Sequence, residues 1–120
     1  MMSREITTLF EQAEDISQFT AITGEKKPGP GYHQLQTPAQ TITFDLPVFS
    51  GDLTIQGTLE MFPGEADWVT LKDINTGQPI TVNGDQIGTF LTMSSLGNFI
   101  WVRVIGNINS SQNIRVLYQY

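Results

Sequence analysis

The sequence predicts an all-β protein: an antiparallel β-sandwich or jelly roll of seven to eight strands, with an N-terminal arm. Three observations predict this class. The 120 residues contain 12 Ile, 6 Val and 14 Thr but only 4 Ala, and β-branched side chains fit a pleated sheet better than a helix. Apolar and polar residues alternate in several short segments. Turn-forming residues separate these segments at spacings of about ten residues, as in sandwiches and barrels. A chain of this length supports one domain with one core.

The first zone, residues 1–31, is expected to be an arm, and its residue spacing fits a short helix. Apolar residues recur there at spacings of three and four, which predicts one amphipathic helix; they are Ile6, Leu9, Phe10, Ala13 and Ile16. Residues 24–31 read GEKKPGPG, and their prolines and glycines predict a linker. A short helix on such a tether is marginal in water. We therefore expect these five apolar residues to dock on a neighbouring chain.

The second zone, residues 32–120, is expected to form the sandwich. Its clearest strand covers residues 53–61, where apolar and polar residues alternate. One face of this strand is therefore expected to be buried and the other exposed to solvent. Similar segments are residues 42–46, 68–71, 79–82, 86–93, 99–105 and 113–120. Asn83-Gly84 lies between two of them and accepts the positive φ of a tight hairpin turn. The expected core consists of Leu53, Ile55, Leu59, Phe90, Ile100, Val102, Val104 and Val116.

The segment 99–105 is apolar on both sides of the alternation. This pattern is typical of a strand that is covered on both faces. One row, residues 100, 102 and 104, is assigned to the core. The other row is interrupted by Arg103, and we expect it to bind a partner, either the arm or another subunit; its apolar members are Phe99, Trp101 and Ile105.

Little in the sequence indicates catalysis or a cofactor. The chain has no cysteine and one histidine, His33, which argues against a zinc site and a serine triad. Paired carboxylates could hydrolyse a glycosidic bond, and Glu65 and Asp67, with Asp52 or Asp85, could bind calcium. These acidic residues are more simply interpreted as solvated residues of turns. We therefore expect no enzyme activity, no catalytic residue, no metal and no cofactor.

The net charge and the length of the apolar runs argue against two classes of partner. A net charge of −6 disfavours a nucleic-acid partner, and no segment reaches the roughly 20 apolar residues of a membrane span. The first residues do not resemble a signal peptide, which agrees with synthesis in a cytoplasm. Aromatic residues could form a platform for sugar rings; the candidates are Tyr32, Trp68, Trp101, Tyr118 and Tyr120.

Three segments together resemble a pattern of small β-sandwich virion proteins of tailed bacteriophages, the head decoration or cement proteins and related head or tail surface modules. They are GDLTIQGTL at residues 51–59, DWVTL at 67–71 and FIWVRV at 99–104. In that pattern a GxLTIxG strand leads through a turn to a dWxxL strand, and a VRV strand lies near the end. About fifty to seventy residues are covered by the resemblance.

The resemblance implies a non-enzymatic structural protein that decorates or cements a capsid. Its partners would be further copies of itself, as a homo-oligomer, and other virion proteins such as the major capsid protein. Its location would be the virion, after synthesis in the host cytoplasm. The alternatives are a structural or host-attachment module of the neck or tail, and a carbohydrate-binding module.

Overall fold

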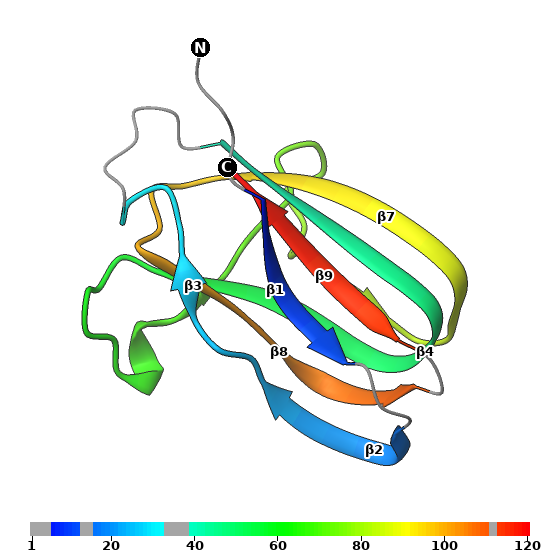
Figure 1. Ribbon diagram of the computed structural model, residues 1–120. Coiled ribbons are helices and arrows are strands. Elements are labelled where there is room, and N and C mark those ends of the chain that lie inside the picture. The colour runs from blue at the N-terminus through cyan, green and yellow to red at the C-terminus, as the bar shows by residue number, and fades with distance from the viewer. Residues whose placement is uncertain (1–5, 13–15, 33–38, 111–112) are drawn as a thin grey trace.

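Figure 1 shows the computed structural model, which describes residues 6–12, 16–32, 39–110 and 113–120. These residues form nine strands and one short 3-10 helix, and all strand pairs are antiparallel. The all-β prediction is confirmed. The elements are β1 (Ile6–Gln12), β2 (Ile16–Thr23), β3 (Lys27–Pro28), β4 (Ala39–Thr58), η1 (Glu65–Asp67), β5 (Val69–Thr70), β6 (Thr81–Asn83), β7 (Gln86–Leu96), β8 (Trp101–Ser110) and β9 (Ile114–Gln119).

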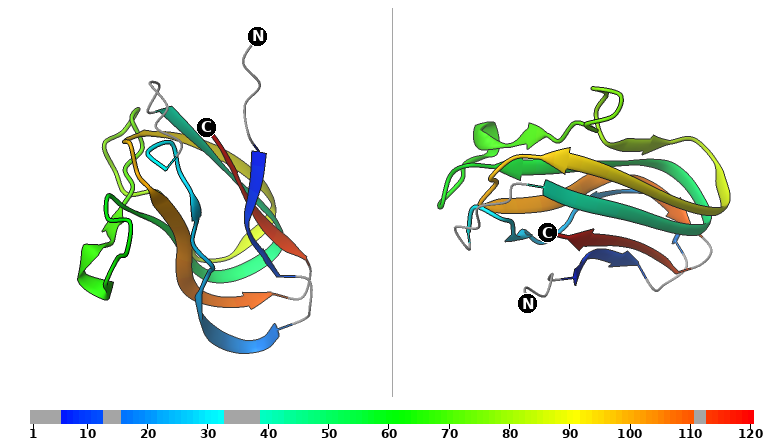
Figure 2. Two further views of the ribbon diagram at one scale, coloured as in Figure 1. Left: turned by 60° about the vertical axis from the view of Figure 1, so that its left-hand side comes forward. Right: turned by 90° about the horizontal axis from the view of Figure 1, so that it is seen from above.

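The 20-residue strand β4 joins two predicted strands and connects the whole sheet. Its first half pairs with β7 on one side and β9 on the other, and β9 also pairs with β1. Its second half pairs with β8 on one side and with the short strands β5 and β6 on the other. Figure 2 shows that the sheet curls, so that these two halves are turned toward each other.

The curl of β4 is visible in its burial pattern. Even-numbered residues up to Leu46 are buried, whereas buried positions from Phe49 to Ile55 are odd-numbered. The buried face therefore changes across Pro47 and Val48. Gly51 follows with a φ of 120°, and a Cβ there would lie 2.0 Å from the Asn107 carbonyl oxygen of β8. Only glycine permits this close approach of two backbones.

The core lies on the inner face of the curled sheet and draws side chains from β1, β4, β8 and β9 and from the chain between β5 and β7. Its fully buried aromatic members are Phe44, Phe49 and Tyr118. The expected core residues of β8 and β9 are buried, and so are the two of β4; they are Val102, Val104, Val116, Leu53 and Ile55. Ile100 is half-buried.

Two expected core residues, Leu59 and Phe90, are exposed instead, at 65% and 69%. Leu59 lies just beyond the end of β4, where the alternation no longer applies. Phe90 is opposite Asp45 on β4, whereas its neighbour Leu91 is opposite the buried Phe44. Because directly paired residues share a face of the sheet, the inner position belongs to Leu91, and the prediction for Phe90 is wrong.

The helix predicted within residues 1–31 is also wrong. Strand β1 pairs with β9, and β2 pairs with β8, so the described part of this zone belongs to the sheet of its own chain. Leu9 is buried in the core and Phe10 packs against it. A register shift between Thr8 and Phe10 breaks the alternation of β1, which explains how a strand can show a helix-like spacing. Ala13 lies outside the described residues.

The Gly/Pro segment 24–31 runs alongside β8 and the residues just before it. It is hydrogen-bonded to them and is not a free linker. Gly29 N donates to Ile100 O at 2.9 Å, and Gly31 N donates to Phe99 O at 2.9 Å. A Cβ on Gly31 would stand 2.2 Å from the Asn98 carbonyl oxygen. Here glycine serves close packing and not flexibility.

The Asn83-Gly84 turn has the expected positive φ, 84° at Gly84. It does not join two strands that pair with each other. β6 and β7 both pair with β4, through Asp52↔Asn83 and Phe49↔Gln86, and lie end to end along it. The predicted hairpin is therefore wrong for the described strands. Among the described residues, no helix has the length and apolar character to cross a membrane.

Candidate interaction surface

Strand β8 places Trp101 and Arg103 on the outer face of the sheet. Val102 and Val104 are fully buried in the core, and successive residues of a strand point to opposite faces. Ile105 is half-buried. Phe99 precedes the strand and packs against the core. The row expected to bind a partner is therefore divided, with Phe99 contributing to the core.

Trp101 fastens two neighbouring segments to β8. Its indole Nε1 donates a hydrogen bond to the Met61 carbonyl oxygen at 2.9 Å. Its ring centroid lies 5.0 Å from that of Tyr32, at an angle of 47°. Lys26 Nζ stands 5.0 Å from the same ring, within range of a cation–π contact. The ring thus holds the loop after β4 and the chain around residues 26–32 in place.

Arg103 provides a second attachment for the loop between β4 and β5. Its guanidinium carbon lies 4.2 Å from the Trp68 ring centroid. Its Nε donates to Gln56 Oε1 at 2.9 Å, and a terminal nitrogen lies 3.3 Å from Glu65 Oε2. The Arg103 side chain is only 10% exposed, so a partner protein would meet little of its charge. Its role is to hold Trp68 and η1 against the sheet.

The same loop also has internal hydrogen bonds. Thr58 Oγ1 accepts a bond from Glu60 N at 3.2 Å. Asp67 Oδ2 accepts from Gly64 N at 2.7 Å, and Asp67 N donates to Gly64 O at 3.1 Å, which closes η1. With Trp101 bound at Met61, these contacts hold the loop at its start, middle and end.

Apolar side chains project from this fixed loop and the strand that follows it. Phe62 is 92% exposed, and we call it and three similar residues the loop-tip patch: Leu59, Met61, Phe62 and Val69. Tyr32, beside Trp101, is also exposed. Figure 2 shows the loop standing out from the body of the sheet. Exposed apolar residues that follow one another closely along a fixed loop are candidates for an interaction site.

Three of the four acidic residues considered as calcium ligands have other partners. Glu65 pairs with Arg103, Asp67 accepts a bond from Gly64 N, and Asp85 accepts one from the Ser50 hydroxyl at 2.6 Å. In the part of the chain that the structure describes, no three histidine, cysteine or acidic side chains gather closely enough to hold a metal ion. His33 lies outside that part.

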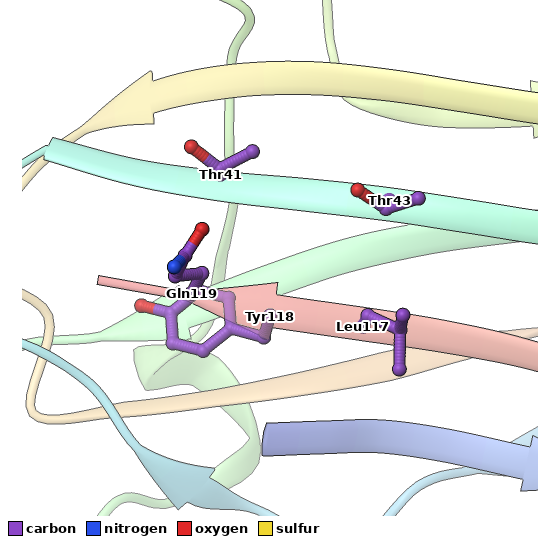
Figure 3. Close-up of a pocket in the computed structure, with 5 residues that line it drawn as sticks. All are labelled: Thr41, Thr43, Leu117, Tyr118 and Gln119. Atoms are coloured by element: carbon purple, nitrogen blue, oxygen red, sulfur yellow. The ribbon is translucent and has the colours of Figure 1, made fainter. Parts of the chain in front are cut away.

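A hollow of about 120 Å³ lies between β4 and β9 and is shown in Figure 3. Thr41, Thr43, Leu117, Tyr118 and Gln119 line it. Tyr118 is its one titratable lining residue; burial raises the pKa of this phenol above its ordinary value, with a smaller contribution from Tyr120. The lining therefore offers no carboxylate or imidazole for acid–base chemistry.

The aromatic residues do not form the single platform that the sequence allowed. Tyr118 is fully buried and donates its hydroxyl proton to Gln40 Oε1. Tyr120 lies beside it, 5.4 Å between ring centroids. Tyr32 and Trp101 form a separate pair, and Trp68 is covered by Arg103. A sugar-stacking surface is thus reduced to Tyr32 and Trp101.

The fold and this surface define an all-β protein with one curled antiparallel sheet and a fixed apolar loop. No family model matches the sequence, and a comparison with curated proteins finds no significant match. Among solved structures, the chain is similar to the crystal structure of the SPBc2 prophage-derived protein YomS. The TM-score is 0.57 at 10% identity, and the match covers 98% of this chain and 91% of YomS. The shared feature is the fold, along nearly the whole of both chains.

Proposed function

We propose that this chain is a non-enzymatic structural protein of a tailed-bacteriophage virion that decorates or cements the capsid by protein–protein contacts. The observation that carries the proposal is the loop-tip patch, an apolar surface presented by a fixed loop. The likeness of the fold to a prophage-derived protein supports a phage origin. The three sequence segments that resemble virion proteins support it independently.

The loop-tip patch has the physical properties of a docking anchor. Phe62 is 92% exposed, so nearly all of its burial free energy, about 1.5–3 kcal/mol, is available for binding. The loop is already fixed by Trp101 and Arg103. Binding therefore orders few groups, which reduces its entropic penalty. A buried aromatic anchor is a common centre of binding energy in protein interfaces.

Charge agrees with a position on the outside of a particle. The net charge of −6 repels the packaged genome and other particles. Two of the acidic residues of the loop, Glu65 and Asp67, are used in holding it. In this account the capsid protein receives Phe62 in an apolar recess, and many copies add up moderate contacts over the shell.

A neck, tail or host-attachment role is the second candidate, and the Tyr32–Trp101 pair favours it. Tyr32 is 43% exposed, and Lys26 stands over the neighbouring indole. An exposed ring with a cation beside it can stack on a sugar and bind its polar groups. This candidate places the contact on Tyr32 and Trp101, whereas the capsid proposal places it on Phe62.

The test measures binding of the purified protein to capsids that lack it, by co-sedimentation. Phe62→Ser should lower the affinity roughly ten- to hundredfold, as expected from the free energy of burying one Phe side chain. Ile74→Ser is the matched control, because Ile74 is 52% exposed but lies outside the loop-tip patch. Equal binding by both variants, or binding of the wild type to tails or cell-surface glycans in place of capsids, contradicts the proposal.

A further inference from the structure

A second hollow lies on the outer side of β8, between the loop after β4 and the chain just before β3. Its volume is about 220 Å³, and six residues from these segments line it: Gly24, Lys26, Pro63, Glu65, Trp68 and Arg103. Four of their side chains bring two cations, one carboxylate and one indole to the same opening. The hollow thus combines hydrogen-bond donors, an acceptor and an aromatic ring.

Arg103 is the nearly buried polar side chain of this hollow. Only 10% of the side chain is exposed. Its Nε donates to Gln56 Oε1, and its Nη2 donates to Glu65 Oε2. Among the described residues, the third nitrogen, Nη1, has no hydrogen-bond partner. Because no fully buried side-chain nitrogen or oxygen of these residues lacks a partner, Nη1 reaches solvent, and the hollow is the opening that Arg103 lines.

Lys26 and Glu65 add a second donor and an acceptor. Lys26 is exposed, and its Nζ forms no ion pair or hydrogen bond within the described ranges. The Glu65 side chain is 89% exposed. Only its Oε2 is bound by Arg103, so Oε1 is available to a ligand. The hollow therefore offers at least two free donors and one free acceptor.

We propose that this hollow binds a neutral sugar residue. A hydroxyl group both donates and accepts hydrogen bonds, so adjacent sugar hydroxyls match Glu65 on one side and Arg103 with Lys26 on the other. The indole of Trp68 supplies a flat apolar surface for the sugar ring. This inference goes beyond the capsid role and does not depend on it.

The charges of the hollow favour a neutral ligand. An anion would meet the carboxylate of Glu65 and a chain whose net charge is −6. A cation would meet Lys26 and Arg103. A sugar hydroxyl meets neither repulsion, and charged side chains form stronger hydrogen bonds with it than neutral ones do.

The main contacts of the hollow are in place before a ligand binds. Arg103 is held by Gln56, by Glu65 and by the Trp68 ring, 4.2 Å from the guanidinium carbon. Asp67 closes the turn beside them through Gly64 N. Binding therefore orders few groups. Because the hollow is small and takes up one sugar ring, we expect dissociation constants in the millimolar range.

An NMR titration of the full chain tests this site. The chain has two tryptophans, so isotopically labelled protein gives two indole N–H signals, of which Trp68 reports the hollow. The neutral probes are the methyl glycosides of glucose, galactose, mannose and N-acetylglucosamine. Glucuronic acid and inorganic phosphate are the charged comparisons. At least one neutral sugar should shift the Trp68 signal more than the Trp101 signal, and the charged probes should bind more weakly.

Two lysine substitutions test the contacts. Lys26→Ala should weaken binding of that sugar about tenfold, because it removes a charged donor. Lys72→Ala is the matched control: it removes the same charge at an exposed position that does not line the hollow. Phe62→Ser should leave sugar binding unchanged, and Lys26→Ala should leave capsid binding unchanged, so the two proposals can fail separately. Circular dichroism checks that the variants keep the strand signal.

Three results would overturn the sugar site. The first is a Trp68 signal that none of the neutral sugars shifts. The second is equal binding by folded Lys26→Ala and Lys72→Ala. The third is a shift confined to Trp101, which would assign the sugar to the Tyr32–Trp101 pair. Binding of glucuronic acid or phosphate alone would contradict the choice of a neutral ligand.

Discussion

The guanidinium of Arg103 lies over the ring of Trp68, 4.2 Å from its centroid, and this contact ties β8 to the loop that presents Phe62. The same side chain binds Gln56 of β4 and Glu65 of η1. A charged group that is 10% exposed needs such partners, since desolvation without them is unfavourable. The position of the loop-tip patch therefore depends on a residue that is itself almost hidden.

Arg103→Met should loosen this loop and destabilise the protein. It removes the bonds to Gln56 and Glu65, and we expect a loss of about 1–3 kcal/mol in the free energy of unfolding. Arg115→Met is the control, because the Arg115–Asp45 pair is more exposed and should contribute less than about 1 kcal/mol. Urea unfolding measures the difference, and limited proteolysis near residue 62 reports the loop. Equal losses in the two variants would contradict this role.

Leu9→Ala should show that the first strand belongs to the core. Leu9 is 2% exposed, and truncation of a buried Leu reduces the free energy of unfolding by about 2–5 kcal/mol. Thr8→Ala, at an exposed neighbouring position, should change it by less than about 1 kcal/mol. Deletion of residues 1–31 should prevent folding of the remainder, because it removes β1, β2 and β3 from the sheet. A folded, stable deletion variant would instead restore the interpretation of this zone as a separate arm.

Gly31→Ala should be strongly unfavourable, although its segment reads as a linker. The added Cβ would stand 2.2 Å from the Asn98 carbonyl oxygen, and such overpacking lowers the free energy of unfolding by about 1–3 kcal/mol. At Gly64 the nearest atom would be 3.5 Å away and φ is −89°, so Gly64→Ala should be tolerated. The two melting temperatures provide the comparison. An unchanged melting temperature for Gly31→Ala would mean that this segment is not packed on β8.

The stability of the protein should fall above pH 10 because of Tyr118. Burial raises the pKa of its phenol in the folded state, whereas in the unfolded state it ionises near pH 10. The unfolded state therefore releases this proton first, and the free energy of unfolding decreases with rising pH by up to about 1.4 kcal/mol per unit. Urea unfolding between pH 8 and 11 tests this. Tyr118→Phe should have a shallower slope; an identical slope would exclude Tyr118 as the cause.

The sequence predicted the features that depend on local alternation. It placed Val102 and Val104 in the core and Trp101 on the opposite face, because period-two burial can be read directly from residue order. The prediction of a helix at the beginning of the chain was wrong. The register shift in β1 breaks the alternation of this strand, so that its apolar residues, which include Leu9 and Phe10, show a helix-like spacing. Whether glycine permits flexibility or close approach depends on its neighbours in space, which the sequence does not contain.

The docking surface was harder to predict than the core. Leu59 and Met61 continue the alternation of β4, so their exposure depends on where that strand ends. The apolar Phe62 directly before Pro63-Gly64 was the available signal for an exposed tip. The prediction that Phe90 lies in the core was wrong. Its exposure depends on the register with Asp45 and on the absence of a further strand beside β7 in the described sheet, and neither can be read from residue order.

Electron cryomicroscopy of the phage particle would show where this protein lies. We predict density for this fold on the outer surface of the capsid, with the loop that carries Phe62 against the major capsid protein. Particles assembled with Phe62→Ser should lose that density. Density for this fold only at the neck or tail, or particles that contain none of this protein, would rule out a capsid decoration role.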